Sequence, residues 1–535
     1  MNKSSIYLLL ILILFLTACG SDQAATTEVQ QETMSQLSPD ERYGELFEMV
    51  QMGEVFPDSK TFVDCTPKKT TQEILADFEK ERSLTSFDLN DFVARNFDTP
   101  KQFASGFKSD TSRSITEHIN ALWPVLTRDP DVSTVGTLLP LPKSYIVPGG
   151  GSGEVYYWDA YFTILGLQVA GKWEMIENMA DNFSALIDEV GFVPNANRTY
   201  YLGRSQPPFY ALIIGVLRAQ KGDAALKKYL PYLRKEYDFW MEGMTKLSAD
   251  EPAYRRLVRM KDGSILNRYW DDRPQARPEY YREDVALANN LEAPKEVTYR
   301  HLRAGAESGW DFSSRWFRDQ QYLKSIHTTD IIPVDLNALL YHLEKTLSEA
   351  YAITGDDDES NFFMQKMNNR KRAMMNFCWN EQKAFFMDYD WVARNNTEVL
   401  SLAGMYPLFF AIADTAQAIQ MTSIIEKDFL KPGGVVSTLN ETGQQWDAPN
   451  GWAQLQWMTI KGLRNYGQDT LASVISDRWI NLNTRVYQST GKIVEKYNVV
   501  DMEMEAGAGE YPLQDGFGWS NGVLLRLMAD TEKGE

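Results

Sequence analysis

Amphipathic helical segments separated by short polar turns run through most of this chain, and they limit the folds it can adopt. One apolar helical face is marked by leucines at the spacing i, i+3, i+4, i+7 and i+11: Leu336, Leu339, Leu340, Leu343 and Leu347. The turn at Gly355-Asp356 comes next, and Asp356 is suited to cap a second helix over about 361–378. Alternating strand patterns are scarce, apart from short strands expected near 255–269. The sequence therefore predicts an all-α fold.

Further helices are expected over 224–240, 414–430 and 471–482, each next to a turn that contains glycine or aspartate. No fixed repeat period accompanies them, which disfavours a regular solenoid. Helical hairpins of unequal length, joined by Gly- and Trp-rich loops, favour an α/α toroid, with a generic helical bundle as the alternative. In a toroid the long loops gather at one end, and we expect function there because loops on a rigid scaffold carry chemistry.

The N-terminus has the pattern of an export signal. Lys3 precedes an apolar run over 6–16, which is too short to span a bilayer because a spanning helix needs about 20 residues. The residues 16–19, Leu-Thr-Ala-Cys, resemble a bacterial lipobox. We therefore predict a lipoprotein signal peptide over 1–18 and a lipid on Cys19. A plain cleaved signal or an uncleaved anchor is the alternative.

The segment 19–42 contains no aromatic residue and is rich in Ser, Thr, Gln and acid, so it is predicted to be a flexible tether. A single catalytic domain is predicted over 43–535. On this interpretation the protein is exported and lipid-anchored in the bacterial cell envelope, facing the periplasm or exposed at the surface. Its only link to a membrane would be the N-terminal lipid.

Composition narrows the class of chemistry. The chain has 54 basic and 73 acidic residues, a net charge of −19, and no basic region that would indicate nucleic-acid binding. Four His and three Cys leave little for a zinc cluster or a disulfide framework, so no metal site is expected, and Cys65 and Cys378 are interpreted as buried or inert thiols. The 14 Trp, 26 Tyr and 26 Phe beside many carboxylates suit sugar chemistry, although any large acidic protein could have them.

Six segments are at once polar, aromatic and rich in turn residues: 148–162, 194–208, 277–280, 307–316, 444–452 and 495–519. A Trp beside a carboxylate can desolvate the acid and raise its pKa, as a general acid requires. Arg beside Gln or Glu supplies donors and acceptors for hydroxyl groups. Any one segment could be ordinary loop structure. Together, in a chain with few His, they point to hydrolysis by two carboxylates.

Three of these segments resemble the signatures of the trehalases, glycoside hydrolase family 37. Residues 148–162 resemble the first signature, 444–452 the second, and 509–519 the Gly-rich C-terminal segment. The resemblance covers nearly all of 58–528. It implies an (α/α)6 toroid that hydrolyses α,α-trehalose to two glucose molecules with inversion and without a cofactor.

The resemblance also implies roles for individual residues. Asp311 matches the general acid and Glu495 the general base, and their carboxyl groups would lie about 6.5–9.5 Å apart to admit a water. The positions that would contact the sugar are Trp158, Asp159, Asn195, Arg204, Ser205, Gln206, Arg277, Pro278, Glu279, Gly309, Trp446 and Glu510.

The chain departs from the family pattern in two places. The first signature normally reads Pro-Gly-Gly-Arg-Phe-x-Glu, whereas Gly151 and Ser152 stand here for Arg and Phe, and Gly153 follows. This removes a charged donor and an aromatic wall and loosens the loop. Gln454 replaces the Pro that usually ends the second signature, which matters less because it is expected at a helix start.

The altered loop keeps two alternatives open. The chain could hydrolyse another α-glucoside, or it could be a sugar-binding or sensing relative with weak activity. Retention of both Asp311 and Glu495 argues for an enzyme, while loss of the Arg argues for the binding protein. In each case the expected partner is a small disaccharide, and a monomer is expected.

Overall fold

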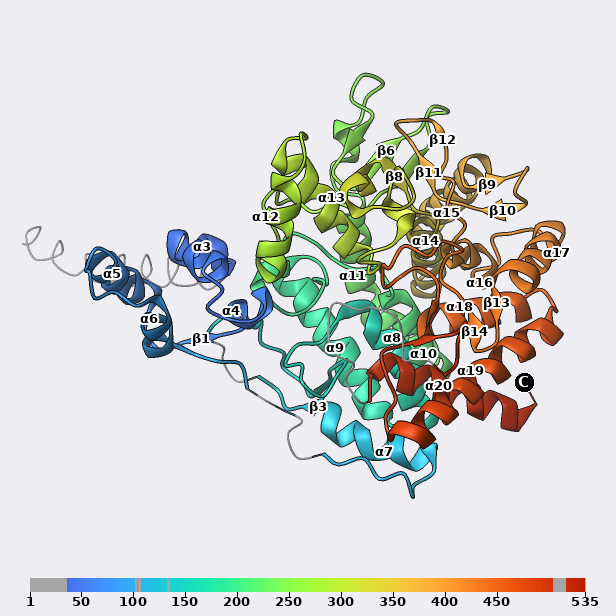
Figure 1. Cartoon of the computed structure of the whole chain (residues 1–535). Coiled ribbons are helices and arrows are strands. Elements are labelled where there is room, and N and C mark those ends of the chain that lie inside the picture. Colours follow the sequence, from blue (N-terminus) through green and yellow to red (C-terminus); the bar gives the residue numbers. More distant parts are fainter. Residues whose placement is uncertain (1–35, 102, 104–106, 132–134, 504–515, 535) are drawn as a thin grey trace, which may run out of the picture. The chain divides into compact units, whose positions relative to one another are not determined.

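The computed structural model describes residues 36–101, 103, 107–131, 135–503 and 516–534 (Figure 1). The chain divides into two compact units. The N-terminal unit comprises the described residues up to 100 together with 135–139 and 278–282, and the helical unit comprises the other described residues. The N-terminal unit begins before residue 43, and the expectation of one catalytic domain over 43–535 stays a prediction.

Short helices make up most of the N-terminal unit. Its elements are α2 (Pro39–Tyr43), α3 (Glu45–Met52), α4 (Ser59–Val63), β1 (Thr66–Pro67), α5 (Thr71–Glu81), α6 (Leu89–Asn96), β2 (Phe97–Asp98) and the 3-10 turn η3 (Pro278–Tyr280). The strands β1 and β2 pair antiparallel. A capping box begins α5, because Thr70 and Glu73 each accept a hydrogen bond from the other's backbone N–H.

Six helices of the helical unit contact one another in a closed order within the described residues. This inner ring runs α8 (Tyr157–Val169), α10 (Tyr210–Lys221), α14 (Val334–Thr354), α16 (Tyr406–Phe409), α18 (Ala453–Arg464) and α20 (Gly518–Lys533), which returns to α8. The outer helices are α7 (Ile115–Leu126), α9 (Trp173–Val190), α11 (Asp223–Trp240), α15 (Asp357–Phe377), α17 (Thr415–Ile424) and α19 (Asp469–Thr490). The predicted all-α (α/α)6 toroid of helical hairpins is confirmed.

The ring closes where two glycines meet. A Cβ on Gly166 of α8 would lie 2.6 Å from the Cα of Gly522 in α20, and a Cβ on Gly522 would lie 2.0 Å from the carbonyl oxygen of Phe162. The two backbones therefore touch, which only glycine allows. As an inner helix, α8 is buried without a break from Tyr157 to Leu167.

Sequence-predicted helices are found with shifted ends. The five leucines from Leu336 to Leu347 are all buried in α14, which ends at Gly355 with a φ of 83°. Asp356 caps α15 by accepting from Glu359 N, as expected. The segment 471–482 is part of the longer α19, and 414–430 breaks after α17 into a π-helical turn over Ile425–Phe429.

The remaining elements of the helical unit are α12 (Tyr281–Asn289), which begins among residues of the N-terminal unit, α13 (Lys295–Glu307) and short antiparallel strands. The strand groups are β3 (Thr127–Arg128) with β4 (Tyr145–Ile146); β5 (Ala253–Tyr254), β6 (Leu257–Arg259) and β7 (Ile265–Asn267); β8 (Ile331–Ile332), β11 (Tyr389–Asp390) and β12 (Asn395–Asn396); β9 (Trp379–Asn380) with β10 (Phe385–Phe386); β13 (Leu430–Lys431) with β14 (Gly434–Val435); and β15 (Asn450–Trp452) with β16 (Lys496–Asn498). The strands expected near 255–269 are β6 and β7.

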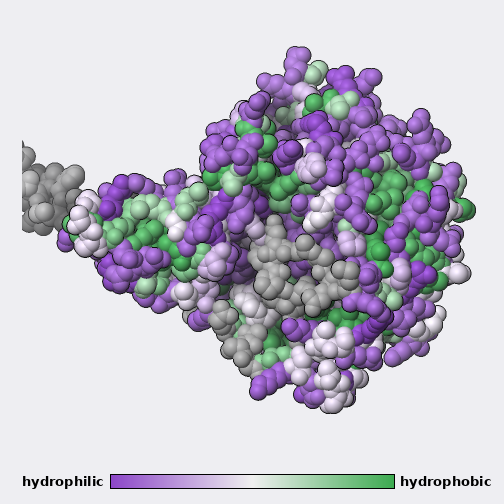
Figure 2. Space-filling view, in the orientation of Figure 1, coloured by the Kyte–Doolittle hydropathy of each residue, from purple (hydrophilic) through white to green (hydrophobic). Residues whose placement is uncertain are grey.

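The face shown in Figure 2 is mostly hydrophilic, with smaller hydrophobic areas between. Among the described residues, no helix has the length and apolar character needed to cross a membrane. Cys65 and Cys378 are both buried free thiols, and burial raises the pKa of Cys65 to about 12, which keeps it protonated. The predicted signal peptide, Cys19 and residues 19–35 of the predicted tether lie outside the described residues, whereas residues 39–42 of that tether belong to α2.

Candidate active site

Asp311 lies in the turn that follows α13. Gly309 has a φ of 74°, and a Cβ at this position would lie 2.8 Å from the indole ring of Trp158, so the turn requires glycine. Trp310 is fully buried, whereas Asp311 keeps part of its surface exposed. The turn thus anchors one side chain in the core and leaves the next one accessible.

A buried carboxylate, Asp447, fixes the chain just after Asp311. Its Oδ1 accepts hydrogen bonds from Ser313 Oγ at 2.7 Å, Ser314 Oγ at 2.9 Å and Thr438 Oγ1 at 2.9 Å. Its Oδ2 accepts from Ser314 N at 2.8 Å and Thr442 Oγ1 at 2.5 Å. Asp447 has no exposed surface, so these donors take the place of water in stabilising its charge. The segment 444–452 therefore clamps the loop that carries Asp311.

Glu495 precedes β16, which pairs antiparallel with β15. The backbone oxygen of Glu495 accepts from Trp519 Nε1 at 2.8 Å, which attaches this segment to α20. Its carboxylate lies 3.0 Å from Lys496 Nζ, and the Glu495 side chain is 19% exposed. The carboxylate is consequently held by a cation on one side while remaining open to small molecules.

Asp159 lies in the first turn of α8 and is almost fully enclosed. Burial raises its pKa well above the usual range, and the negative charges of Glu495 and Asp311 raise it further. Three carboxyl groups from three distant segments thus share one electrostatic environment. Asp159 therefore stays protonated at pH values at which ordinary carboxyl groups are ionised. A protonated carboxyl group can donate a hydrogen bond.

A cluster of tryptophans backs these carboxyl groups: Trp158, Trp310, Trp446, Trp452 and Trp519. The rings of Trp446 and Trp452 stack at 3.7 Å with an interplanar angle of 3°, and Trp446 also stacks on Trp310 at 5.3 Å. Trp158 N donates to Gln206 Oε1 at 3.1 Å, which ties this cluster to the segment before α10. Trp158 and Trp446, both predicted to contact sugar, are buried members of the cluster.

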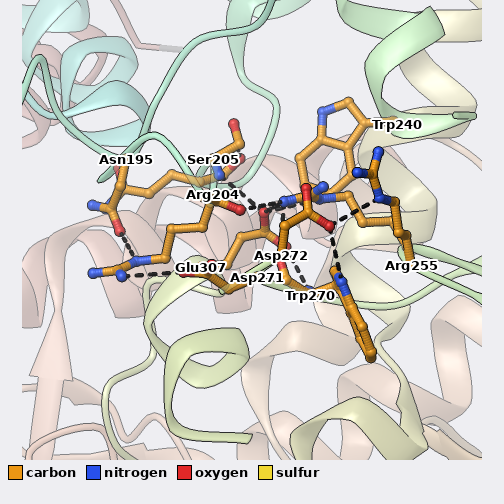
Figure 3. A network of polar contacts seen from close by, with 12 residues as sticks. Asn195, Arg204, Ser205, Trp240, Arg255, Trp270, Asp271, Asp272 and Glu307 are labelled. Atoms are coloured by element: carbon orange, nitrogen blue, oxygen red, sulfur yellow. Dashed lines mark hydrogen bonds and ion pairs between the residues drawn. The ribbon is translucent and has the colours of Figure 1, made fainter. Parts of the chain in front are cut away.

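Arg204 belongs to a buried polar network (Figure 3). Its Nε donates to Asn195 Oδ1 at 3.1 Å, and its Nη1 lies 3.4 Å from Asp271 Oδ2, which Arg303 Nη1 also contacts at 2.9 Å. Burial alone would raise the pKa of Asp271, but Arg303 and Arg204 outweigh it and hold the pKa below its usual value. The ionised Asp271 therefore orients Arg204 beside Asn195.

Ser205 is attached to the same region through Glu307. Ser205 N donates to Glu307 Oε1 at 2.9 Å, Arg256 Nη2 contacts the same oxygen at 2.5 Å, and Trp270 N donates to Oε2 at 2.7 Å (Figure 3). The Ser205 hydroxyl donates to the backbone oxygen of Val193 at 2.6 Å. The side chain of Ser205 is thus engaged with the protein backbone.

Arg277 forms a two-pronged pair with Asp284, with Nε at 3.0 Å and Nη2 at 2.7 Å from its carboxylate oxygens. Its guanidinium lies 5.0 Å from the ring centroid of Phe312, the residue after Asp311. Pro278 and Glu279 are buried in η3, which belongs to the N-terminal unit, and their contact with sugar stays a prediction. Glu510 lies outside the described residues.

The Gly-rich loop 148–154 is held by its backbone. Arg128 Nη2 donates to the carbonyl oxygens of Gly150 at 3.0 Å and Ser152 at 2.7 Å, and its guanidinium lies 4.2 Å from the ring centroid of Phe103. Gly151, at the position of the family's Arg, is exposed. An arginine from another segment thus supports the loop through its carbonyl groups.

Sequence reasoning missed the residues that hold the site: Asp271, Asp284, Glu307, Asp447 and Lys496. Asp447 and Lys496 stand beside named motif residues, but only burial and long-range partners reveal what they do. In the described part of the chain, no group of three His, Cys, Asp or Glu side chains is arranged to hold a metal ion. The proposed roles of the predicted site residues stay predictions.

The comparisons with known proteins agree with this architecture. A family model described as Trehalase matches residues 54–532. The chain is similar to the structure of neutral trehalase Nth1 from Saccharomyces cerevisiae, with 27% identity and a TM-score of 0.60, over 72% of this chain and 73% of that one. It also resembles GH63 mannosylglycerate hydrolase from Thermus thermophilus in complex with glucose, at 16% identity and a TM-score of 0.52, over 78% and 100% of the two chains, a likeness of fold.

Proposed function

Because the chain belongs to the trehalase family, we propose that it hydrolyses α,α-trehalose to two glucose molecules with inversion at the attacked anomeric carbon. The observation that carries this proposal is the shared electrostatic environment of Asp159, Asp311 and Glu495, three carboxyl groups from separate segments. The family supports glycoside hydrolysis as the type of reaction, and two of these carboxyl groups suffice for it.

The reaction would proceed in one displacement. Asp311 protonates the oxygen that bridges the two sugars, while Glu495 removes a proton from a water on the opposite face of the ring. The water oxygen bonds to the anomeric carbon as the bridging bond breaks, and one product leaves with the proton from Asp311. One β-glucose and one α-glucose are released.

Other residues would bind the substrate. Protonated Asp159 can donate to a sugar hydroxyl, because burial keeps its pKa high and the nearby Glu495 raises it further. Arg204 keeps a fixed orientation through Asp271 and Asn195, so its guanidinium can meet the sugar without loss of side-chain entropy. Asn195, Gln206, Arg277 and Gly309 complete this set of proposed contacts.

Early products tested by proton NMR separate inversion from retention. The proposal requires equal amounts of α- and β-glucose before mutarotation, and two α-glucose molecules would contradict it. Asp311→Asn and Glu495→Gln should each lower kcat on trehalose by at least about 1,000-fold, since each removes one of two essential proton transfers.

Two probes distinguish the acid from the base. α-Glucosyl fluoride needs no acid assistance, so Asp311→Asn should hydrolyse it far better than trehalose, whereas Glu495→Gln should fail on both. Azide should restore turnover to Glu495→Ala and yield β-glucosyl azide, because it attacks without a base. Equal failure of both variants on the fluoride would contradict the assigned roles.

The Gly151–Gly153 loop favours a second candidate, hydrolysis of another α-glucoside, because an Arg and a Phe of the family signature are missing there. Rates on trehalose, maltose, kojibiose and nigerose test it, and a preference for one of the last three would establish it. Calorimetric binding of trehalose without turnover would instead favour a sugar-binding or sensing protein.

We also propose that the protein is exported and anchored in the bacterial cell envelope by a lipid on Cys19, on the strength of the lipobox-like sequence 16–19. Cys19→Ser should move the protein from the membrane fraction to the soluble fraction. If the unchanged protein is already soluble, the proposal is wrong. Light scattering of the lipid-free protein tests the expected monomer.

A further inference from the structure

Lys496 is a buried lysine beside the proposed base. Its side chain is 1% exposed, and its Nζ lies 3.0 Å from Glu495 Oε2. The ammonium is 5.3 Å from the ring centroid of Trp452, its cross-strand neighbour in β15. An ammonium removed from water is costly unless charged and polar partners surround it, so this position requires partners.

Gln445 supplies another of these partners and extends the contact to the proposed acid. Its Oε1 accepts from Lys496 Nζ at 3.3 Å, and its Nε2 donates to the backbone oxygen of Asp311 at 2.5 Å. Its own backbone oxygen accepts from Trp452 Nε1 and Asn450 Nδ2, both at 3.0 Å. The backbone of Gln445 is therefore held by two donors, while its side-chain amide connects Lys496 to the turn that carries Asp311.

We propose that Lys496 and Gln445 form a positioning bridge that holds the carboxylate of Glu495 and the Asp311 turn at the spacing required for hydrolysis. The path runs from Glu495 through the ammonium and the amide to the backbone of Asp311. This inference rests on the proposed function, because it assigns Lys496 and Gln445 to the proton-transfer pair. Neither residue touches the reacting atoms, so both are positioning residues.

The groups around Glu495 come from several elements. Asp159 of α8 interacts electrostatically with Glu495 and with Asp311, which lies in the turn after α13. From α20, the uncharged Trp519 and Ser520 donate to the backbone oxygen of Glu495. Lys496 supplies the cation that pairs with the Glu495 carboxylate, at 3.0 Å.

Single substitutions give the first test. Lys496→Met should lower kcat on trehalose about 30- to 300-fold with KM changed less than about threefold, and should move the acid limb of the pH–rate profile to higher pH. Lys496→Arg should recover a large part of the rate because it keeps the charge. Lys492→Met, which removes an exposed charge from the same segment, is the matched control and should behave as the unchanged protein.

A double-mutant cycle tests the bridge itself. Gln445→Ala should lower kcat about 10- to 100-fold, and the double variant with Lys496→Met should lose little more than Lys496→Met alone, since the two side chains act as a unit. Gln445→Glu should also be slow, because it cannot donate to Asp311 O and it competes with Glu495 for the ammonium. Additive losses in the cycle would overturn the proposal.

Failure of the bridge and failure of the proposed function give different results. If Glu495→Gln abolishes turnover while Lys496→Met and Gln445→Ala leave kcat and the pH profile unchanged, the bridge is wrong and the function stands. If Glu495→Gln remains active, the base assignment and the bridge are both wrong. Should Lys496→Met not fold, judged by circular dichroism, Lys496→Arg and the two Gln445 variants decide the question in the same measurements.

Discussion

Two loops that adjoin candidate site residues in the sequence are fixed in different ways. The loop after Asp311 is held by the buried carboxylate of Asp447, which accepts three hydrogen bonds from Ser313 and Ser314. The loop 148–154 is held through backbone carbonyl groups by Arg128, and it carries Gly151 and Ser152 where the family has Arg and Phe. A hydrogen bond made by a loop side chain is lost when that residue is replaced, whereas a hydrogen bond to a loop carbonyl group is not. The sequence of loop 148–154 can therefore change while its backbone conformation is kept.

Removing the carboxylate of Asp447, which holds the loop after Asp311, should have the largest effect on kcat. Asp447→Asn keeps the volume but turns an NH₂ group toward donors, which leaves buried hydroxyl groups without an acceptor. We expect kcat to fall at least about 100-fold and the free energy of unfolding to fall by about 2–4 kcal/mol. Trehalose kinetics and urea unfolding measure the two quantities. Asp477→Asn, an exposed position on α19, is the control, and equal behaviour of both variants would remove the distinction between the loops.

The contrast between the loops also shows what the sequence could predict. The leucines of α14 and the turn at Gly355 identify a hairpin from local spacing alone. Ring closure depends on Gly166 meeting Gly522, and no local pattern pairs positions so far apart. The fold class was therefore predictable, but the contact that closes the ring was not.

The site divides in a similar way. Asp311 and Glu495 were identified through motifs that resemble a family, whereas the function of Asp447 depends on Ser313 and Ser314, more than 130 residues earlier in the chain. Lys496 looks like an ordinary surface lysine until its burial is known. Residues predicted to face the substrate could be inferred from the resemblance to a family, while residues that hold them needed the fold.

Restoring the Arg and Phe of the family signature in loop 148–154 should have the next largest effect on the rate. Gly151→Arg with Ser152→Phe adds a charged donor and an aromatic wall, and one charged hydrogen bond is worth about 1.5–3 kcal/mol. We expect kcat/KM on trehalose to rise about 10- to 100-fold, measured by glucose release. Gly151→Lys with Ser152→Phe is the matched control, since it lacks the two-pronged donor and should gain less. No gain would mean that the site functions without these side chains.

Weakening the hydrogen bonds from Arg128 to the carbonyl groups of loop 148–154 should have a smaller effect on the rate. Arg128→Lys keeps the charge but cannot reach Gly150 and Ser152 together, because an ammonium lacks the planar fork of a guanidinium. We expect KM to rise about three- to tenfold with kcat changed less than about threefold, as for a loop that binds rather than reacts. Arg113→Lys, at an exposed position, is the control. A large loss of kcat would show that loop 148–154 is as critical as the clamped loop.

The smallest effect on turnover is expected where loop 148–154 enters α8, at Tyr157, whose hydroxyl contacts the buried Glu236. Burial raises the pKa of Glu236 to about 8, so the folded protein binds a proton there that the unfolded chain releases above its ordinary pKa of about 4.5. Stability from this group is therefore complete below about pH 4.5 and is lost as the pH rises to about 8, by up to about 1.4 kcal/mol per pH unit. Glu236→Gln should flatten that pH dependence in urea unfolding and change kcat less than about twofold, with the exposed Glu174→Gln as control. Identical slopes in Glu236→Gln and the unchanged protein would show that Glu236 is not protonated in the folded protein.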